Sequence, residues 1–309
     1  MTHTSRRTVL ASMAAVAAGL PTLNAVVGNG ATPAAAADTY SSNMKLYTVK
    51  ADREGIDWMR RFRIGGGAVT DNGRYASVPL NSTAVLAPHG GGIEAGTSEL
   101  CMAVAGYKPF DYDTDPAAAA EPGEPQRDFW MFEALASSST QHVTSTNCND
   151  PAAVAVCSSN LYAVSLHGFA TDVEKKIIIG GRDERLKRNL YEAFTASGFT
   201  TNLAVTVVIA APGDPINGDD TRNIVNRTRT GAGAQLEIST PLRAAMFGDF
   251  STGASRRSSA GVPSTDSPKA DLYWNGFVKN VRRAIVNHEM GKDPFYVDNP
   301  TAADPNLPS

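Results

Sequence analysis

The sequence is poor in cysteine, has no excess of basic residues and contains no long apolar run, and each absence excludes a class of protein. Only three cysteines occur among the 309 residues, and none stands in a Cys-x-x-Cys pair, which excludes a cysteine-rich zinc site. The 28 basic residues are outnumbered by 31 acidic ones, so the composition argues against a general nucleic-acid-binding protein. No segment reaches the roughly 20 apolar residues that span a membrane.

The first 37 residues are typical of an export signal. The stretch SRRTVL, with Arg6 and Arg7, precedes the apolar stretch ASMAAVAAGL and a run of small residues that ends at Ala37. This order predicts export by the twin-arginine route, cleavage after Ala37 and a secreted protein that is free of the membrane after cleavage. The remaining 272 residues carry 26 basic and 31 acidic groups, a formal charge of −5.

The rest of the chain has the composition of a globular protein, with 42% apolar residues overall. We expect a single α/β catalytic domain over 38–290, a loop insertion at 107–127 and a flexible tail at 291–309. Apolar stretches predict strands at 83–88, 161–166, 175–179, 202–211 (buried on both faces) and 234–239, and helices at 97–105, 183–198 and 271–289. Strands that alternate with helices predict three layers, with a mixed, mostly parallel sheet between helices.

The cysteines suggest one crosslink. Cys148 and Cys157 flank the stretch NDPAAVAV, and an exported protein reaches a compartment where disulfides persist, so we expect a bridge between them. Cys101 lies in an apolar helical pattern and is expected to be a buried thiol.

Two predicted strands end at a His-Gly pair, which indicates a metal site. His89 follows the first strand and His167 the second, so both imidazoles are expected at one edge of a parallel sheet. After His89, three glycines allow the backbone to turn so that Glu94 returns to the same point. A His/Glu/His set suits a catalytic zinc ion, which takes three protein ligands and leaves a position for water.

Each of these residues also has an ordinary structural explanation. A histidine after a strand is often only hydrogen-bonded, and a glutamate before a helix favours the positive helix terminus. A glycine-rich loop can bind phosphate, but no Gly-Lys-Ser/Thr sequence follows this one. The other histidines fit a metal site less well, since His142 lies in a Ser/Thr-rich loop and His288 near a helix C-terminus.

Glu237 and a nearby group of polar residues complete the predicted site. Glu237 is a carboxylate in the apolar stretch AQLEIS, and it either faces solvent or acts as the general base on water. Arginine binds carboxylates with two hydrogen bonds, so we expect Arg227, next to Asn226, to hold a substrate carboxylate. Arg182, in GGRD, is a second candidate.

The motifs APHGGGIEAGTSEL, SLHGF, IIIGGRD, NIVNR and AQLEIS occur in this order and resemble the phage-type poly-γ-glutamate hydrolases, a zinc peptidase family. The resemblance covers roughly residues 75–245. It implies a zinc carboxypeptidase-like fold and one zinc ion per chain on His89, Glu94 and His167. It also implies Glu237 as the catalytic glutamate and cleavage of γ-glutamyl amide bonds.

We therefore expect a monomeric, secreted zinc-dependent hydrolase whose partner is an anionic γ-glutamyl polymer or peptide, with no nucleic acid involved. Two alternatives stay open: a peptidase that cleaves γ-glutamyl links of peptidoglycan, and a non-catalytic polymer-binding module with a structural metal. A structural zinc would have a fourth protein ligand, whereas a catalytic one would not.

Overall fold

The fold is described from a computed structural model. It describes residues 38–65, 81–109, 119–136, 139–171 and 173–295. The predicted export signal (1–37), the centre of the predicted insertion (110–118) and most of the predicted tail (296–309) lie outside the described residues. Within the described ranges, no helix combines the length and the apolar character needed to cross a membrane.

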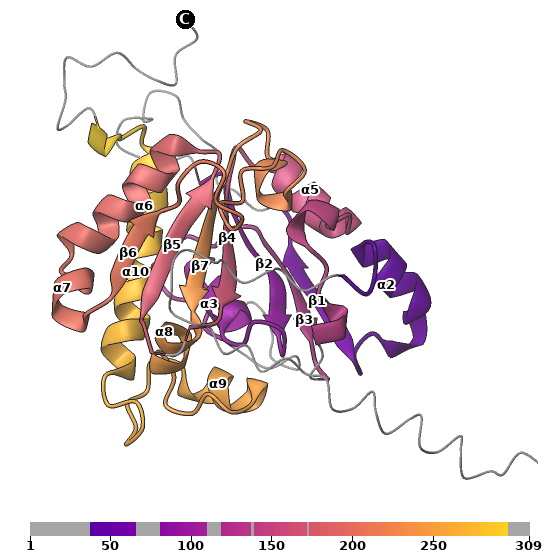
Figure 1. The fold of residues 1–309 in the computed structure, drawn as a ribbon, viewed down its shortest axis with the longest axis horizontal. Helices are drawn as coiled ribbons and strands as arrows, with labels where there is room; N and C mark the ends of the chain where they lie inside the picture. Colours follow the sequence, from indigo (N-terminus) through magenta and orange to yellow (C-terminus); the bar gives the residue numbers. More distant parts are fainter. Residues whose placement is uncertain (1–37, 66–80, 110–118, 137–138, 172, 296–309) are drawn as a thin grey trace, which may run out of the picture. The chain divides into compact units, whose positions relative to one another are not determined.

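A mixed seven-stranded sheet runs through the middle of the fold (Figure 1), in the order β1-β3-β2-β4-β7-β5-β6. The strands are β1 (Trp58–Arg63), β2 (Thr83–Gly91), β3 (Phe129–Ala134), β4 (Tyr162–Phe169), β5 (Lys176–Gly181), β6 (Thr206–Ile209) and β7 (Ala234–Ser239). Four of the six neighbouring pairs are parallel, and only β1–β3 and β5–β7 are antiparallel. The predicted mixed, mostly parallel sheet is confirmed.

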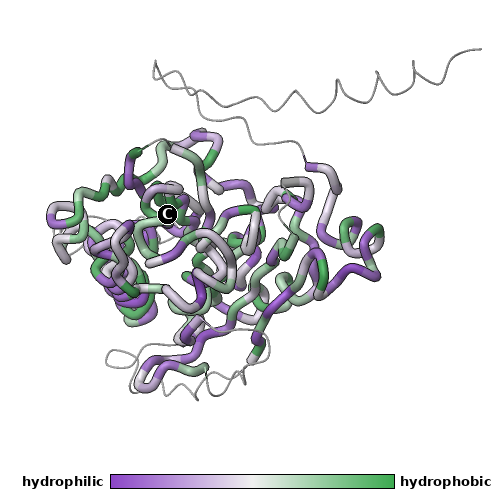
Figure 2. The backbone as a smooth tube through the Cα atoms, turned by 90° about the horizontal axis from the view of Figure 1, so that it is seen from below, coloured by the Kyte–Doolittle hydropathy of each residue, from purple (hydrophilic) through white to green (hydrophobic). Residues whose placement is uncertain are grey.

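Helices cover both faces of the sheet, which gives the predicted three layers. The first face packs in one core with α3 (Thr97–Val104), α6 (Glu184–Ala196), α7 (Phe199–Leu203), α8 (Thr240–Ala245) and α10 (Ala270–Glu289). The second face packs with α2 (Asn43–Val49), α5 (Pro151–Ser159) and the 3₁₀ turn Ile224–Asn226. The short helix α9 (Gly253–Ser259) follows α8. Hydrophilic and hydrophobic stretches alternate along the helices in Figure 2, as expected for helices with one buried side.

Helix α6 shows how local sequence produces these elements. The Asp183 side chain accepts a hydrogen bond from the Leu186 N–H at 2.9 Å and so caps the helix as predicted. Leu186, Leu190 and Phe194 are all buried in the core of the first face. Gly198, with φ +75°, stands between α6 and α7, where a left-handed residue ends a helix readily.

One strand prediction needs correction, and two strands were missed. The stretch 202–211 is not a long buried strand: α7 takes its first residues, and β6 keeps four residues at the edge of the sheet, with Thr206 and Ile209 exposed. An edge strand pairs on one side only, so its apolar composition does not guarantee burial. Strands β1 and β3 were not predicted, although β3 is buried along its whole length and pairs with β2.

The predicted disulfide is wrong for this structure. Cys148 and Cys157 are buried free thiols, as is Cys101. The stretch between the first two is not a loop, because Pro151 starts helix α5 and Cys157 lies in its last turns.

The central strands bring the predicted site residues together. β4 lies between β2 and β7 and is parallel to both, so the carboxyl ends of all three strands lie at one edge of the sheet. In this register His167 on β4 is paired with Glu237 on β7. Both histidines lie inside their strands rather than after them, since β2 extends to Gly91 and β4 to Phe169.

Candidate metal centre

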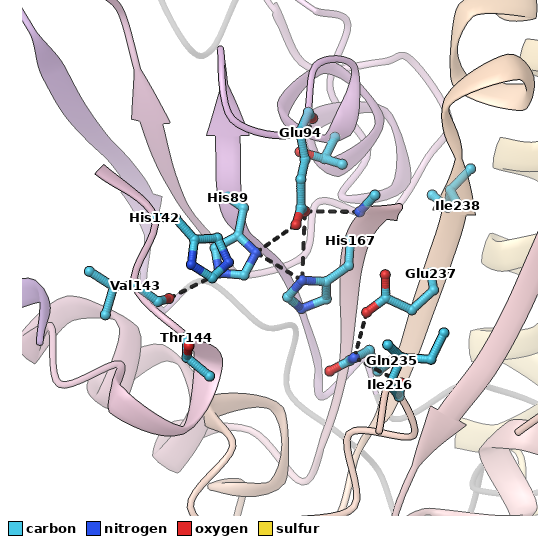
Figure 3. A network of polar contacts seen from close by, with 12 residues as sticks. His89, Glu94, His142, Val143, Thr144, His167, Ile216, Gln235, Glu237 and Ile238 are labelled. Carbon is cyan, nitrogen blue, oxygen red and sulfur yellow. Dashed lines mark hydrogen bonds and ion pairs between the residues drawn. The ribbon is translucent and has the colours of Figure 1, made fainter. Parts of the chain in front are cut away.

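His89, Glu94 and His167 converge, and one ligand atom from each lies within 4.8 Å of the others (Figure 3). The His89 Nδ1 is 2.8 Å from Glu94 Oε1 and 3.2 Å from His167 Nδ1. The His167 Nδ1 is 3.7 Å from Glu94 Oε2. Both histidines are buried, with 4% and 3% of their surface exposed.

The loop after His89 closes by a short turn that its glycines permit. The Glu94 N–H donates to the His89 carbonyl oxygen at 2.8 Å, which returns the Glu94 side chain to His89. Gly91 has φ +67°, and a Cβ built on it would lie 2.3 Å from the Ala134 carbonyl oxygen of β3. A side chain at Gly91 would therefore be strained and would push the loop away from β3. Glycine at this position thus permits both the close approach to β3 and the turn that brings Glu94 back to His89.

The hydrogen bonds around the three side chains leave their ligand atoms directed at one point. The His89 Nε2 lies 3.0 Å from the Val143 carbonyl oxygen, which can only accept, so Nε2 carries a hydrogen and Nδ1 is the ligand atom when the ring is neutral. Glu94 Oε2 accepts from the Gly168 N–H at 2.9 Å. The His167 Nε2 is buried and has no hydrogen-bond partner among the described residues.

These atoms fit a tetrahedral metal ion. Ligands at zinc bond lengths of about 2.0–2.1 Å are about 3.3 Å apart at the corners of a tetrahedron. The His89 Nδ1 approaches this separation from both His167 Nδ1 and Glu94 Oε1. No fourth metal-binding side chain joins the group in the described part of the chain. Two imidazole nitrogens and a carboxylate are a zinc-type donor set that leaves one position open.

The electrostatics of the three groups favour ligand protonation states. Burial opposes the anionic form of Glu94, but the charge and hydrogen bond of His89, together with the charge of Arg243, lower its pKa overall. Burial lowers the pKa of His167 to about 3, so its ring is neutral at physiological pH. Burial also disfavours charged His89, but the Glu94 carboxylate raises the pKa of His89. A divalent cation bound at the same point would compete with the proton for these atoms.

Glu237 lies beside His167, on the side away from His89 (Figure 3). Its Oε1 accepts from Gln235 Nε2 at 2.8 Å, and 8% of the residue is exposed. Burial, followed by the negative charge of Glu94, raises the pKa of Glu237. A carboxyl group with a raised pKa exchanges protons near neutral pH, which is the property of a general acid or base. The alternative of a solvent-facing Glu237 is wrong.

Comparison with known proteins identifies the family. Residues 72–267 match the sequence pattern of the family described as poly-gamma-glutamate hydrolase. This chain belongs to the poly-gamma-glutamate hydrolase family. A solved structure of a bacteriophage poly-gamma-glutamate hydrolase is similar, with a TM-score of 0.59 and 25% identity over 82% of this chain and 98% of that one.

Relatives from Bacillus subtilis strain 168 are also similar. The UPF0714 protein YndL is 32% identical over 169 residues, which are 54% of this chain and 57% of YndL. The prophage-derived YoqZ is 32% identical over 54% of this chain and 52% of YoqZ. The matches thus span about half the length of these curated relatives. A structure described as zinc-free YndL has a TM-score of 0.58 and 26% identity, over 82% of this chain and 99% of that one.

Arg243 is a site residue that sequence reasoning missed. It is 4% exposed and donates to the Ile238 carbonyl at 3.0 Å and to the Ala95 carbonyl at 2.5 Å. It therefore joins the loop that carries Glu94 to the strand that carries Glu237. Arg243 also fills the space beside Gly168, where a Cβ would lie 2.4 Å from the Arg243 Cζ.

His142 belongs to the site, although its Ser/Thr-rich surroundings had counted against it. Its ring centroid lies 4.1 Å from that of His89, with a 39° angle between the planes. Burial and the neighbouring His89 lower the pKa of His142. The local sequence gives no sign of this contact, since the ring reaches His89 from a segment more than 50 positions away.

The predicted substrate-binding residues lie in different environments. Asn226 is buried, and its Nδ2 donates to the Gly218 and Asp220 carbonyls while its Oδ1 accepts from Gly233 N–H. Its amide thus supports the loop before β7, and the expectation of a substrate contact is corrected. Arg227 and Arg182 are exposed. Arg227 donates to the Cys148 carbonyl at 3.0 Å, and Arg182 to the Asp219 carbonyl at 3.3 Å.

Arg182 lies at a different level of the sheet from Glu237. It follows Gly181, which pairs with Ala234, whereas Glu237 pairs with Ile178 of the same strand. Because β5 runs antiparallel to β7, three residues separate these pairs, about 10 Å along the sheet. Arg182 therefore lies near the start of β7, at the level of Ala234, and not beside Glu237.

Proposed function

We propose that this protein is a secreted, zinc-dependent hydrolase of γ-glutamyl amide bonds, with poly-γ-glutamate as its substrate. The observation that carries the proposal is the convergence of His89, Glu94 and His167 within 4.8 Å, beside the buried carboxyl group of Glu237. Membership in the poly-gamma-glutamate hydrolase family supports the substrate, and the zinc-free description of the YndL structure supports the metal.

In this proposal each residue has a separate task. His89, Glu94 and His167 would hold the zinc ion, which when bound would supply the Lewis acidity that polarises an amide carbonyl and activates water. Glu237 accepts a proton from the attacking water and returns it to the leaving amine, as its raised pKa allows. Gln235 donates to one Glu237 oxygen, so the other oxygen is available for this transfer.

The substrate carboxylates need cationic partners. A γ-glutamyl chain carries one α-carboxylate per residue, and the exposed side chains of Arg227 and Arg182 are suited to bind them.

The test combines two measurements on one purified sample: zinc per chain, and shortening of poly-γ-glutamate with and without a chelator. We expect about one zinc ion per chain and shortening that stops when the metal is removed. Glu237→Gln should keep zinc and lose turnover, because the amide cannot accept the proton, whereas His89→Ala should lose both. A Glu237→Gln protein that cleaves at the wild-type rate would contradict the general-base role.

The same experiment separates the alternatives. Zinc without shortening would redirect the proposal to γ-glutamyl links of cell-wall peptides, which are then assayed by release of free amines. Zinc with no hydrolysis of either substrate would favour a non-catalytic binding module. The group of three protein ligands among the described residues supports the catalytic reading, because a structural zinc takes four.

We also propose export by the twin-arginine route, as the paired Arg6 and Arg7 indicate. Replacement of both by lysine should leave the protein inside the producing cell. N-terminal sequencing of the exported protein should show Asp38 as the first residue. If the protein found in the medium still carries residues 1–37, the expected cleavage is wrong.

A further inference from the structure

Asp38 contacts the segment 142–147, which in turn contacts His89. The Asp38 carboxylate accepts five hydrogen bonds from this segment. Its carboxylate accepts from His142 Nδ1 at 3.0 Å, from Thr144 N–H at 3.0 and 2.9 Å and from Thr144 Oγ1 at 2.9 Å. The Asn147 Nδ2 donates to it at 2.9 Å. All these partners lie more than 100 positions further along the chain. One carboxylate therefore binds the segment 142–147 to the first described residue.

That segment makes two contacts with the metal ligand His89. Its Val143 carbonyl oxygen lies 3.0 Å from His89 Nε2, and its His142 ring lies over the His89 ring. Figure 3 shows Val143 and His142 on the same side of His89, opposite Glu94 and His167. The tautomer and the ring orientation of His89 are thus set by residues that Asp38 holds in place.

We infer that Asp38 is a positioning residue of the metal centre, acting through His142 and Val143 on His89. This inference rests on the proposed metal site. Asp38 and His142 have side chains that are 9% and 20% exposed, so water competes weakly for their hydrogen bond. Asp38 lies outside the residues 72–267 that match the family pattern. It is also the residue that would become the first of the mature chain after the expected cleavage at Ala37.

The test measures the zinc dissociation constant of the full-length chain by competition with a coloured chelator. Loss of an outer hydrogen-bond partner of a metal ligand weakens metal binding about 10–100-fold, so Asp38→Ala should raise the dissociation constant by that factor. Asp38→Asn keeps an acceptor for Thr144 N–H and should weaken binding less. His142→Phe keeps a ring over His89 but removes the bond to Asp38, and should fall between wild type and Asp38→Ala.

Asp293→Ala is the matched control. Asp293 is a buried carboxylate near the other end of the described chain, and it accepts two hydrogen bonds from Arg188. Its loss should lower the melting temperature but leave the zinc dissociation constant within about twofold. Cobalt(II) in place of zinc adds a second readout, since its visible absorption should change with Asp38→Ala and not with Asp293→Ala.

Each outcome decides the inference. If Asp38→Ala and Asp38→Asn both bind zinc as the wild type does, Asp38 only stabilises the fold and the inference is overturned. An equal effect of Asp293→Ala and Asp38→Ala would overturn it as well, because general destabilisation would then explain the loss. If the wild type binds no zinc, the proposed function fails, and this result is distinct from the other two. Should Asp38→Ala fail to fold, Asp38→Asn and His142→Phe carry the test.

Discussion

Gly168→Ala should destabilise the protein and displace Arg243 at the candidate site, because Arg243 occupies the space that a side chain at position 168 would need. The added Cβ would lie 2.4 Å from the Arg243 Cζ and 2.6 Å from its Nη2. Carbon atoms in contact are about 3.5–4.0 Å apart, so the guanidinium would have to move by more than about 1 Å. Three hydrogen bonds oppose this movement, to the Ile238 and Ala95 carbonyls and to Thr240 Oγ1.

The expected loss follows from these contacts. Overpacking costs about 1–3 kcal/mol, and a weakened hydrogen bond from a charged group adds about 1.5–3 kcal/mol, so we expect a loss of about 2.5–6 kcal/mol in the free energy of unfolding. For a chain of this size the melting temperature should fall by about 5–24 °C. Zinc binding should weaken too, because the Gly168 N–H donates to Glu94 Oε2.

A double-mutant cycle followed by thermal unfolding tests this reasoning. Arg243→Ala removes the obstructing group, so Gly168→Ala should cost less than about 0.5 kcal/mol when added to it. Gly253→Ala is the control, since its Cβ would also meet an arginine end, Arg257 Nη1 at 3.1 Å, but on a side chain that is only half-buried. If Gly168→Ala is equally harmful with and without Arg243, the clash is not the cause and the reasoning is refuted.

Three further predictions concern metal and charge. Zinc at 100 times its dissociation constant should stabilise the protein by about 2.7 kcal/mol. If the melting temperature is the same with and without a chelator, the protein holds no stabilising metal ion. Glu289→Gln should lower the free energy of unfolding in urea by about 3–5 kcal/mol. The change leaves the Arg127 guanidinium, in a residue that is 3% exposed, beside a neutral group. Burial raises the pKa of Asp183, but the hydrogen bond with His288 lowers it overall. The stability that Asp183 contributes is thus complete above the unfolded carboxyl pKa of about 3.9 and lost as the pH falls toward the lower folded value. Asp183→Asn should reduce the loss of stability below pH 4. If the free energy of unfolding falls equally in both proteins below pH 4, the Asp183–His288 contact does not contribute to this loss.

The ligand residues were predictable because their signals are local. His89 and His167 each follow an apolar stretch and precede a glycine, and Glu94 returns within five residues of His89. Parallel strands place such positions at one edge of a sheet whatever the remaining fold. The strand over 234–239 was predictable for the same reason, and with it the place of Glu237, although whether that carboxylate faced solvent was not.

The missed features all depend on contacts between distant residues. Arg243 reaches the Ala95 carbonyl across 148 positions, and His142 reaches His89 from a polar loop. Apolar composition could not reveal that 202–211 lies at the sheet edge, nor could cysteine spacing reveal the helix between Cys148 and Cys157. Burial and pairing are properties of the packed chain and not of a local stretch.

By itself, the sequence determined the alternation of strands and helices and the three residues able to bind one metal ion, because periodicity and short glycine turns act over a few residues. Only the tertiary structure decided which side chains surround that point. Asp38, His142 and Arg243 come from three distant parts of the chain, and each depends on burial and hydrogen bonds that exist once the layers have packed.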